Sequence, residues 1–206
     1  MSGLNLTSQQ LDVLKEIGNI GAGNAATALG QLFNKKVLIN VPSVKILSFP
    51  EVLSAEFLSD PHEIGMAVSV NILGSLTGDM LVLFSLKSAL SMIDILARRK
   101  AGTSQLFNLA DASALSESSN ILCCSYLNAV TEFLKLYKLV PSVNQIHMDT
   151  MARLVRHLIA GLHKGDAGYI LPIENRLFIE DVELNVFVLF LLAQESVHKI
   201  LSINQT

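Results

Sequence analysis

The sequence predicts an α/β (α+β) protein built from two copies of one plan: helix, strand, short helix, strand, strand, helix. Two observations predict this class. Helical and extended patterns follow one another in the same order in both halves of the 206 residues. Particular residues recur as well, because Glu16 and Asn19 return as Glu117 and Asn120, each displaced by 101 positions. We therefore expect a single domain, residues 1–206, made of two repeats at about 8–100 and 107–206.

The first predicted helix, residues 11–32, organises the rest of the chain. Wound at about 100° per residue, its sequence LDVLKEIGNIGAGNAATALGQL separates into two faces. The expected core face is Leu11, Leu14, Ile17, Gly21, Ala25, Ala28, Leu29 and Leu32. The opposite stripe is Asp12, Glu16, Asn19, Gly23 and Gly30, flanked by Ala26 and Thr27.

Glycines are a poor choice for the stability of this helix. Each of the four, at positions 18, 21, 23 and 30, costs roughly 0.8–1.0 kcal/mol against Ala in a helix interior. Something must therefore approach the helix backbone closely. We expect the core to pack against one face and a partner protein to dock on the other.

The remaining elements of the first repeat follow from local patterns. Residues 36–47 are extended around Pro42, and Ser48 with Pro50 has the form of a helix start, which predicts a short helix to about Leu58. Two β-rich runs, 65–73 and 77–86, flank Gly74-Ser75 and predict a hairpin. Residues 87–100 then show helical spacing.

The second repeat contains the same elements. Its predicted elements are a helix at 111–137, an extended run at 140–148 around Pro141, a helix at 150–162, strands at 169–179 and 182–192, and a helix at 194–201. The run LVLFSL at 81–86 is echoed by FVLFLL at 187–192. On the second long helix, the expected exposed stripe is Ser113, Glu117, Asn120, Cys124 and Thr131. The expected core face is Leu115, Leu122, Tyr126, Ala129 and Phe133.

Composition excludes several classes of function. Half of the residues are hydrophobic, 16% are charged and the net charge is −3, which describes a densely packed globular protein without a nucleic-acid footprint. The longest apolar run, 186–193, is far shorter than the ~20 residues of a membrane helix, and no signal-peptide pattern is present. The two cysteines, Cys123 and Cys124, are adjacent, so we expect buried thiols in a reducing, cytoplasmic compartment.

The repeated Glu–Asn couple suits few chemistries. It has no nucleophile and base beside it, the histidines (62, 147, 157, 163 and 198) have no ligand spacing, and there is no phosphate-binding glycine loop. A lone Glu or Asn on a helix surface is ordinarily a solvated side chain. The recurrence of the couple points instead to a function. A carboxylate can engage a cation on a partner, and an amide can hold a water in line with the bond to be broken.

The pattern D/S-x-x-x-E-x-x-N-x22-P, set in EIGNIGAGNAATAL and repeated after about 100 residues, closely resembles the CheC group of the CheC–CheX–FliY response-regulator phosphatases. The resemblance covers essentially the whole chain, and Asp12, Glu16, Asn19 and Pro42 match it residue for residue. It implies a cytoplasmic chemotaxis protein that hydrolyses the aspartyl phosphate of CheY. It also implies a pseudo-twofold domain with a shared, roughly six-stranded sheet and the two motif helices side by side.

The resemblance assigns roles to the couples. Glu16 and Glu117 would each pair with a lysine of the docked response regulator, and Asn19 and Asn120 would each orient the attacking water. Magnesium would belong to the substrate protein, so we expect no metal or cofactor on this chain. The second copy departs from the pattern, because Cys124 stands in place of Gly23 and Pro141 follows Asn120 after 20 residues. We therefore expect two unequal sites, the first being the better.

Members of the CheC type also bind the receptor deamidase CheD, and the resemblance places that contact in the second half. Asp149 is the candidate residue, with an acidic helix cap as the alternative interpretation. The FliY type is disfavoured, because few residues precede the first helix. The main rival to the enzyme is a binding module that docks CheY or CheD with little turnover. A purely structural dimerisation domain would leave the polar stripe without a purpose.

Overall fold

The computed structural model describes residues 7–48, 51–52, 60, 62–162 and 169–202. Its elements are α1 (Ser8–Phe33), β1 (Val37–Val44), β2 (Leu47–Ser48), β3 (Ile64–Gly74), β4 (Gly78–Ser85), α3 (Leu86–Leu96), α4 (Leu109–Phe133), β5 (Leu139–Pro141), β6 (Gln145–Thr150), α5 (Met151–Leu162), β7 (Tyr169–Ile179), β8 (Val182–Leu192) and α6 (Gln194–Ser202). The long elements expected from the sequence are confirmed. Of the predicted short helix, residues 51–52 are helical and 53–58 lie outside the described residues.

One antiparallel sheet is shared by both halves of the chain. Its order is β1-β7-β8-β4-β3-β5, with β2 also pairing with β7 and β6 also pairing with β3. The eight strands therefore fill six positions, since each edge of the sheet is made by two short strands. Strands of the first half pair with strands of the second at three places, β1 with β7, β4 with β8, and β3 with β5 and β6. The expectation of a roughly six-stranded shared sheet is confirmed.

The strand register places a pseudo-twofold axis between β4 and β8. The echoed runs equate Val82 with Val188, since each is the valine after the first residue of its run. These two residues lie directly opposite one another in the ladder. A residue that pairs with its own equivalent must lie on the axis relating the two copies, so the repeat seen in the sequence is a symmetry of the fold.

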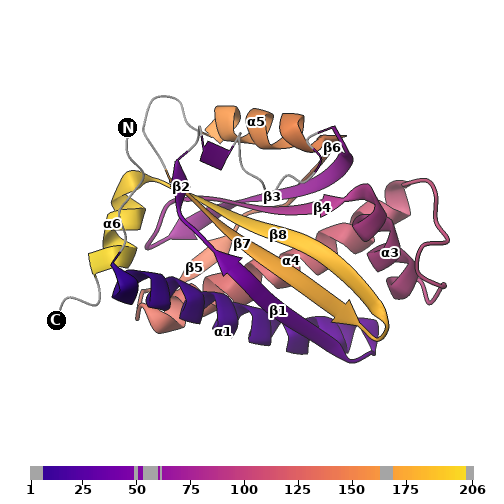
Figure 1. Cartoon of the computed structure of the whole chain (residues 1–206), viewed down its shortest axis with the longest axis horizontal. Coiled ribbons are helices and arrows are strands. Elements are labelled where there is room, and N and C mark those ends of the chain that lie inside the picture. Colours follow the sequence, from indigo (N-terminus) through magenta and orange to yellow (C-terminus); the bar gives the residue numbers. More distant parts are fainter. Residues whose placement is uncertain (1–6, 49–50, 53–59, 61, 163–168, 203–206) are drawn as a thin grey trace.

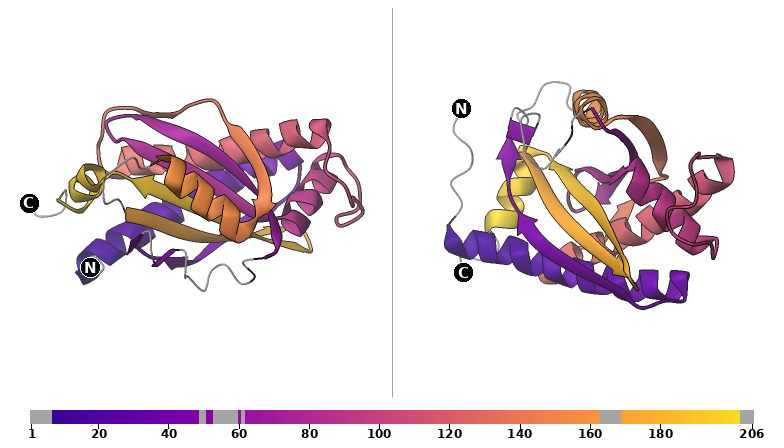
Figure 2. Two further views of the ribbon diagram at one scale, coloured as in Figure 1. Left: turned by 90° about the horizontal axis from the view of Figure 1, so that it is seen from above. Right: turned by 45° about the vertical axis from the view of Figure 1, so that its right-hand side comes forward.

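Helices cover both faces of the curled sheet (Figure 1). The long helices α1 and α4 lie together against one face, and α5 lies on the other; Figure 2 shows the same layers from two further directions. The alternation of the strands matches these layers. Met80, Val82 and Phe84 join the larger core beneath α1 and α4, whereas Leu81 and Leu83 face the smaller core beneath α5.

Helices α1 and α4 run antiparallel and touch closely (Figure 1). They meet at Gly21, where an added methyl carbon would lie 2.4 Å from Cδ1 of Tyr126. Tyr126 is fully buried, donates a hydrogen bond through its hydroxyl to Oδ1 of Asn175 on β7, and meets Phe190 edge to face at 6.2 Å. Burial raises the pKa of the Tyr126 phenol despite that hydrogen bond. The Gly21 backbone therefore makes room for a residue that joins α4 to the sheet.

Several details of the predicted helices are wrong, and the helix predicted at 87–100 ends at Leu96. Leu32 was expected on the core face but is 37% exposed, because Phe33 takes the buried position in the last turn of α1. The second helix ends at Phe133, four residues before the predicted Tyr137. A left-handed residue at Lys135 follows, and Tyr137 is exposed. Phe133 itself is half-buried and not part of the core proper.

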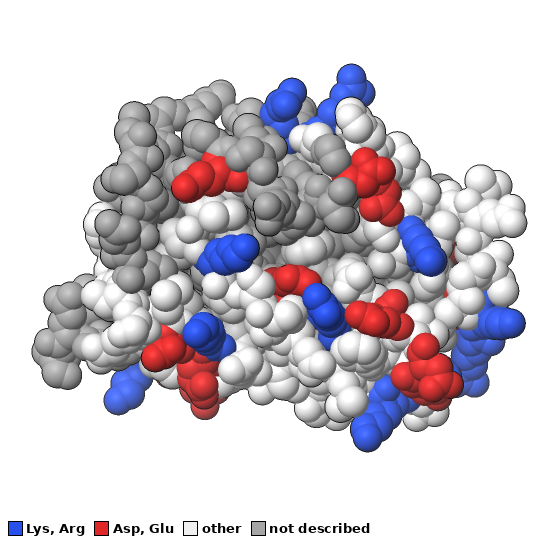
Figure 3. Space-filling model, viewed as in Figure 1, with Lys and Arg blue, Asp and Glu red and all other residues white. Residues whose placement is uncertain are grey.

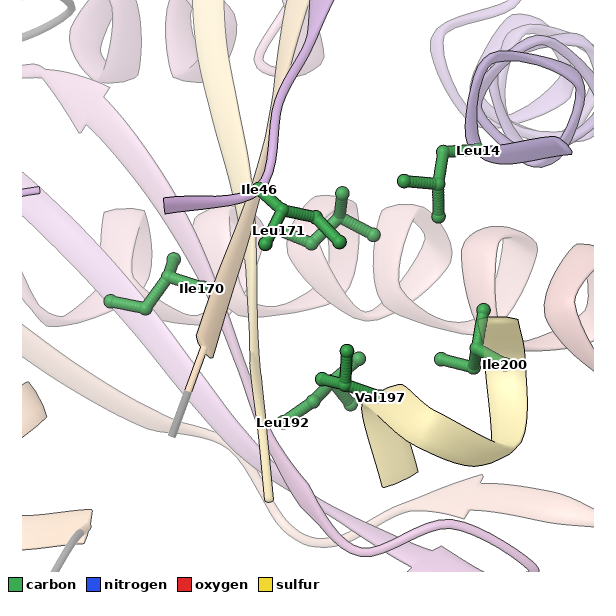
Figure 4. Close-up of a pocket in the computed structure, with 7 residues that line it drawn as sticks. All are labelled: Leu14, Ile46, Ile170, Leu171, Leu192, Val197 and Ile200. Carbon is green, nitrogen blue, oxygen red and sulfur yellow. The ribbon is translucent and has the colours of Figure 1, made fainter. Parts of the chain in front are cut away.

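The closing helix α6 seals the end of the sheet near the start of α1. Val197 and Ile200 of α6 face Leu14 of α1 and Leu192 of β8 across a small apolar pocket (Figure 4). Every side chain that lines this pocket is aliphatic. The pocket is a packing gap of the larger core and has no polar group that could orient a ligand.

Candidate functional site

The first couple lies on the outer face of α1, turned away from the sheet. Glu16 and Asn19 are both exposed, one turn apart. Among the described residues, neither side chain has a hydrogen-bond or ion-pair partner. The buried residues of α1, including Ile17, Gly18 and Gly21, line the opposite stripe. A carboxylate and an amide are thus presented to solvent on a rigid helix, whose start is fixed by the capping box of Thr7 and Gln10.

The four glycines of α1 serve different purposes. A methyl carbon at Gly18 would touch Val41 and Val44 of β1 at 3.3–3.4 Å, and Gly21 packs against Tyr126. Gly30 was expected to leave room for a partner, but a methyl carbon there would lie 3.2 Å from the Lys35 carbonyl oxygen, in the turn that ends α1. Only Gly23, among these four, has open space beside it.

The other residues of the first stripe are exposed but engaged locally. Asp12 lies 3.8 Å from Lys15, an exposed pair of little energetic weight. The Thr27 hydroxyl donates a hydrogen bond to the Gly23 carbonyl oxygen at 3.1 Å, so its donor is used within α1. On this stripe of α1, the Glu16 and Asn19 side chains are therefore left without a local partner among the residues that the structure describes, next to the bare backbone at Gly23.

The second couple has the same position on α4 but a different environment. Glu117 is exposed like Ser113, whereas Asn120 is half-buried. The Cys124 thiol lies 3.9 Å from Oδ1 of Asn120 and donates a weak hydrogen bond to it. Burial, and then the nearby Glu117 carboxylate, raise the pKa of the Cys124 thiol, so the sulfur remains a thiol. Where the first site has open space, the second has a side chain that contacts its amide.

The two cysteines behave differently from one another. Cys123 is fully buried, and burial raises the pKa of its thiol to about 12, as expected for an inert core residue. Cys124 was also expected to be buried but is only half-buried, because it lies on the outer stripe of α4. Ser119, the equivalent of Gly18, is fully buried, and its hydroxyl has no hydrogen-bond partner.

A tether beside the second couple was not predicted. Nδ2 of Asn144, in the loop between β5 and β6, donates to both the carbonyl oxygen and the hydroxyl of Ser116 at 3.0 Å. Ser116 directly precedes Glu117, so the tether fixes this turn of α4 against the sheet edge. The fourth residue of Pro141-Ser-Val-Asn144 is a turn-forming type. No spacing in the sequence connects it with α4.

The two motif prolines lie in the edge strands that support the helices. Pro42 is in β1 where the register with β7 shifts between Asn40 and Ser43. Proline suits such an irregularity on an edge strand because it has no N–H to pair. Val41 within this irregular segment and Val44 just after it pack on Gly18. Pro141 ends β5 opposite Ile72. Both prolines shape the sheet beneath the couples and do not line them.

Asp149 lies on the other side of the sheet, at the end of β6 beside α5. Its side chain is 42% exposed, lies 3.7 Å from Nη1 of Arg153, and accepts a hydrogen bond from the Thr150 N–H at 2.7 Å. Because α5 begins at Met151, Thr150 occupies the N-cap position and Asp149 precedes it. The carboxylate is accessible and is separated from both couples by the sheet.

On the face seen in Figure 3, acidic and basic side chains are interspersed. Within the described part of the chain, no three His, Cys, Asp or Glu residues form a group that could hold a metal ion. Of the described helices, none is both long and apolar enough to cross a membrane.

Comparisons with known proteins agree with this arrangement. The profile of the CheC-like family matches residues 10–46, which hold most of α1 and Pro42. The CheY-P phosphatase CheC of Bacillus subtilis (strain 168) is 34% identical over 157 residues, 73% of this chain and 71% of that protein. The fold matches Thermotoga maritima FliY with a TM-score of 0.77 at 20% identity, covering 97% of this chain and 98% of that one. It matches the FliM middle domain from H. pylori at 0.67 and 14% identity, covering 96% and 99%. The resemblance seen in the motif is thereby confirmed, and the chain belongs to the CheC-like family.

Proposed function

We propose that this chain is a phosphatase that hydrolyses the aspartyl phosphate of a CheY-like response regulator. The observation that supports this most is the Glu16–Asn19 couple, exposed, unengaged and set beside open backbone at Gly23. The relative named a CheY-P phosphatase is 34% identical over most of the chain, which supports the same activity here. A regulator signals inside the cell, so the activity belongs to the cytoplasm.

The chemistry needs positioning more than a strong base. Phosphoryl transfer passes through a loose transition state, and an aspartyl phosphate is already an activated bond. Glu16 pairs with a lysine of the docked regulator and sets its orientation. The Asn19 amide then holds one water in line with the phosphorus. A hundredfold acceleration asks for about 2.7 kcal/mol, which one well-placed amide can supply.

Glu117 and Asn120 have the same roles at a second, weaker site. The Cys124 side chain occupies the position of Gly23 and holds Oδ1 of Asn120, so this amide is less free to bind water. We assign magnesium to the regulator and none to this chain. The phosphoryl group and its metal therefore arrive together on the substrate protein.

The test is the lifetime of a phosphorylated regulator with this protein present. Asn19→Ala combined with Asn120→Ala should remove the acceleration while binding survives. The matched control is Asn24→Ala with Asn128→Ala, since both residues are exposed asparagines of the same helices. The assignment is contradicted if the first pair still speeds dephosphorylation. If even the intact chain binds the regulator without shortening that lifetime, the protein is a binding module.

We also propose that CheD binds near Asp149. Because the sheet separates Asp149 from both couples, CheD and a regulator can bind together. Asp149→Lys should weaken capture of CheD in a pull-down. Arg153→Ala, which removes the neighbouring cation and leaves the carboxylate, is the control. Unchanged capture by Asp149→Lys would exclude this contact.

A further inference from the structure

The two couples lie close together on one face of the helix pair. We propose that they are alternative docking sites, so that the chain binds one response regulator at a time, in either of two orientations related by the pseudo-twofold axis. This rests on the proposed function for the identity of the partner. It adds a stoichiometry and a kinetic consequence that the activity alone does not imply.

Both couples face the same direction. Helices α1 and α4 cover the same face of the sheet and bury equivalent stripes against it. Glu16, Asn19 and Glu117 are exposed and Asn120 is half-buried on the opposite, outer stripes. A protein that approaches the outer face of the pair therefore meets both couples from one side.

The spacing of the couples follows from the contact between the helices. The Tyr126 ring packs on Gly21, which sets these two positions roughly level along the antiparallel helices. Asn120 precedes Tyr126 by six residues and so lies level with position 27 of α1, eight residues beyond Asn19. Eight residues span about 12 Å along a helix. With packed helix axes about 8–10 Å apart, the Asn19 and Asn120 backbones are separated by about 15 Å.

Two regulators do not fit at that spacing. A specific interface covers about 800 Å² on each partner, which corresponds to a disc of about 16 Å radius. Two such discs avoid one another only when their centres are about 32 Å apart, roughly twice the estimated separation of the asparagines. A regulator docked with its phosphoryl group at one couple therefore covers the other.

Mutual exclusion has a kinetic signature. In the Asn19→Ala variant, the first site still docks the regulator through Glu16 but does not hydrolyse its phosphate. A regulator bound there blocks the second site, so part of the protein is held in an unproductive complex. Adding Glu16→Lys removes this unproductive docking. Turnover at saturating regulator should then rise, about twofold if both sites bind equally well and more if the first binds tighter. Independent sites predict no change between the two variants.

The experiment compares saturating turnover for Asn19→Ala with and without Glu16→Lys, and for the mirror pair Asn120→Ala with and without Glu117→Lys. Glu183→Lys is the charge control. Glu183 is exposed on β8 and alternates with Leu184, which faces the core beneath α1 and α4, so its side chain lies on the opposite face of the sheet. It should leave turnover unchanged in either background.

Calorimetric titration with a regulator activated by beryllofluoride gives the stoichiometry, and we expect one regulator per intact chain. Two per chain, with turnover unaffected by Glu16→Lys in the Asn19→Ala background, would overturn mutual exclusion while leaving the phosphatase in place. An intact chain that binds no regulator would overturn both. Continued hydrolysis by Asn19→Ala with Asn120→Ala would instead refute the assigned chemistry and with it the predicted rise.

Discussion

At the scale of single residues, two nearby glycines of α1 lie in opposite environments. Gly21 is buried against the Tyr126 ring and Gly23 borders open space. Gly21→Ala should lower the free energy of unfolding by about 1–3 kcal/mol, because the methyl group overpacks a ring fixed by its hydrogen bond to Asn175. Gly23→Ala should raise it by about 0.8–1.0 kcal/mol through helix propensity. Urea denaturation of both variants measures the two changes.

Gly23→Leu separates stability from docking. A methyl carbon at position 23 has no neighbour within 4 Å, so the leucine side chain starts from open space and the fold should keep the stability of the Ala variant within about 0.5 kcal/mol. Dephosphorylation by the first site should nevertheless weaken, since the regulator is held further from Asn19. If Gly21→Ala and Gly23→Ala destabilise the fold equally, the contrast between a packed Gly21 and an open Gly23 is wrong.

The sequence pattern could not separate these glycines. It showed that each weakens a helix, and it placed Gly21 on the core face and Gly23 and Gly30 on the outer stripe. That Gly30 belongs to the end of its own helix depends on Lys35 folding back, a tertiary detail. The exposure of Glu16 and Asn19 was predictable because helical periodicity alone fixes which face they share.

At the scale of elements, Asp94 connects α3 to the loop that leads into α4. Its carboxylate is fully buried and accepts from the Ser104 hydroxyl at 2.6 Å, from the N–H groups of Thr103 and Ser104 at 2.8 and 3.0 Å, and from Arg99 at 2.9 Å. Burial alone would raise the pKa of Asp94. The hydrogen bonds from Ser104, Arg99 and Thr103 together outweigh burial and hold it well below its usual value.

This depressed pKa makes part of the stability depend on pH. The ionised carboxylate stabilises the fold above the ordinary Asp pKa of about 4, and that contribution is lost as the pH falls toward the folded-state pKa. Asp94→Asn should lower the free energy of unfolding by about 2 kcal/mol at pH 7, and the difference should shrink below about pH 4. Denaturation at several pH values measures this. A difference that persists at low pH would contradict this explanation. The control is Asp12→Asn, which removes an exposed ion pair with Lys15.

At the scale of the whole molecule, the two halves depend on one another. The edge strand β1 pairs with β7, and β5 with β6 pairs with β3. Each half alone keeps only its own hairpin, β3 with β4 or β7 with β8, and loses every other strand pairing of the sheet. Separately produced residues 1–105 and 106–206 should show no cooperative unfolding, and mixing them should restore it. A cooperative transition in either half alone would show that a repeat is an independent unit.

The architecture was predictable to the degree that it is periodic and repeated. The order of elements follows from local patterns, and the duplication of Glu16 and Asn19 pointed to the axis that Val82 and Val188 mark in the sheet. The division of each edge into two short strands was not predictable, because it depends on where each edge strand loses register with its neighbour. Differences between the two sites likewise depend on contacts, such as that of Cys124 with Asn120.

The proposed hydrolysis depends on Asn19 and Asn120 acting on a docked substrate. The most direct measurement is the decay rate of the aspartyl phosphate when this protein is in excess over the regulator, so that every regulator is bound and docking no longer limits the rate. The intact chain should accelerate decay, and Asn19→Ala with Asn120→Ala should return it to the rate of the regulator alone although the complex still forms. A bound regulator that loses its phosphate as fast with the variant as with the intact chain would contradict the account.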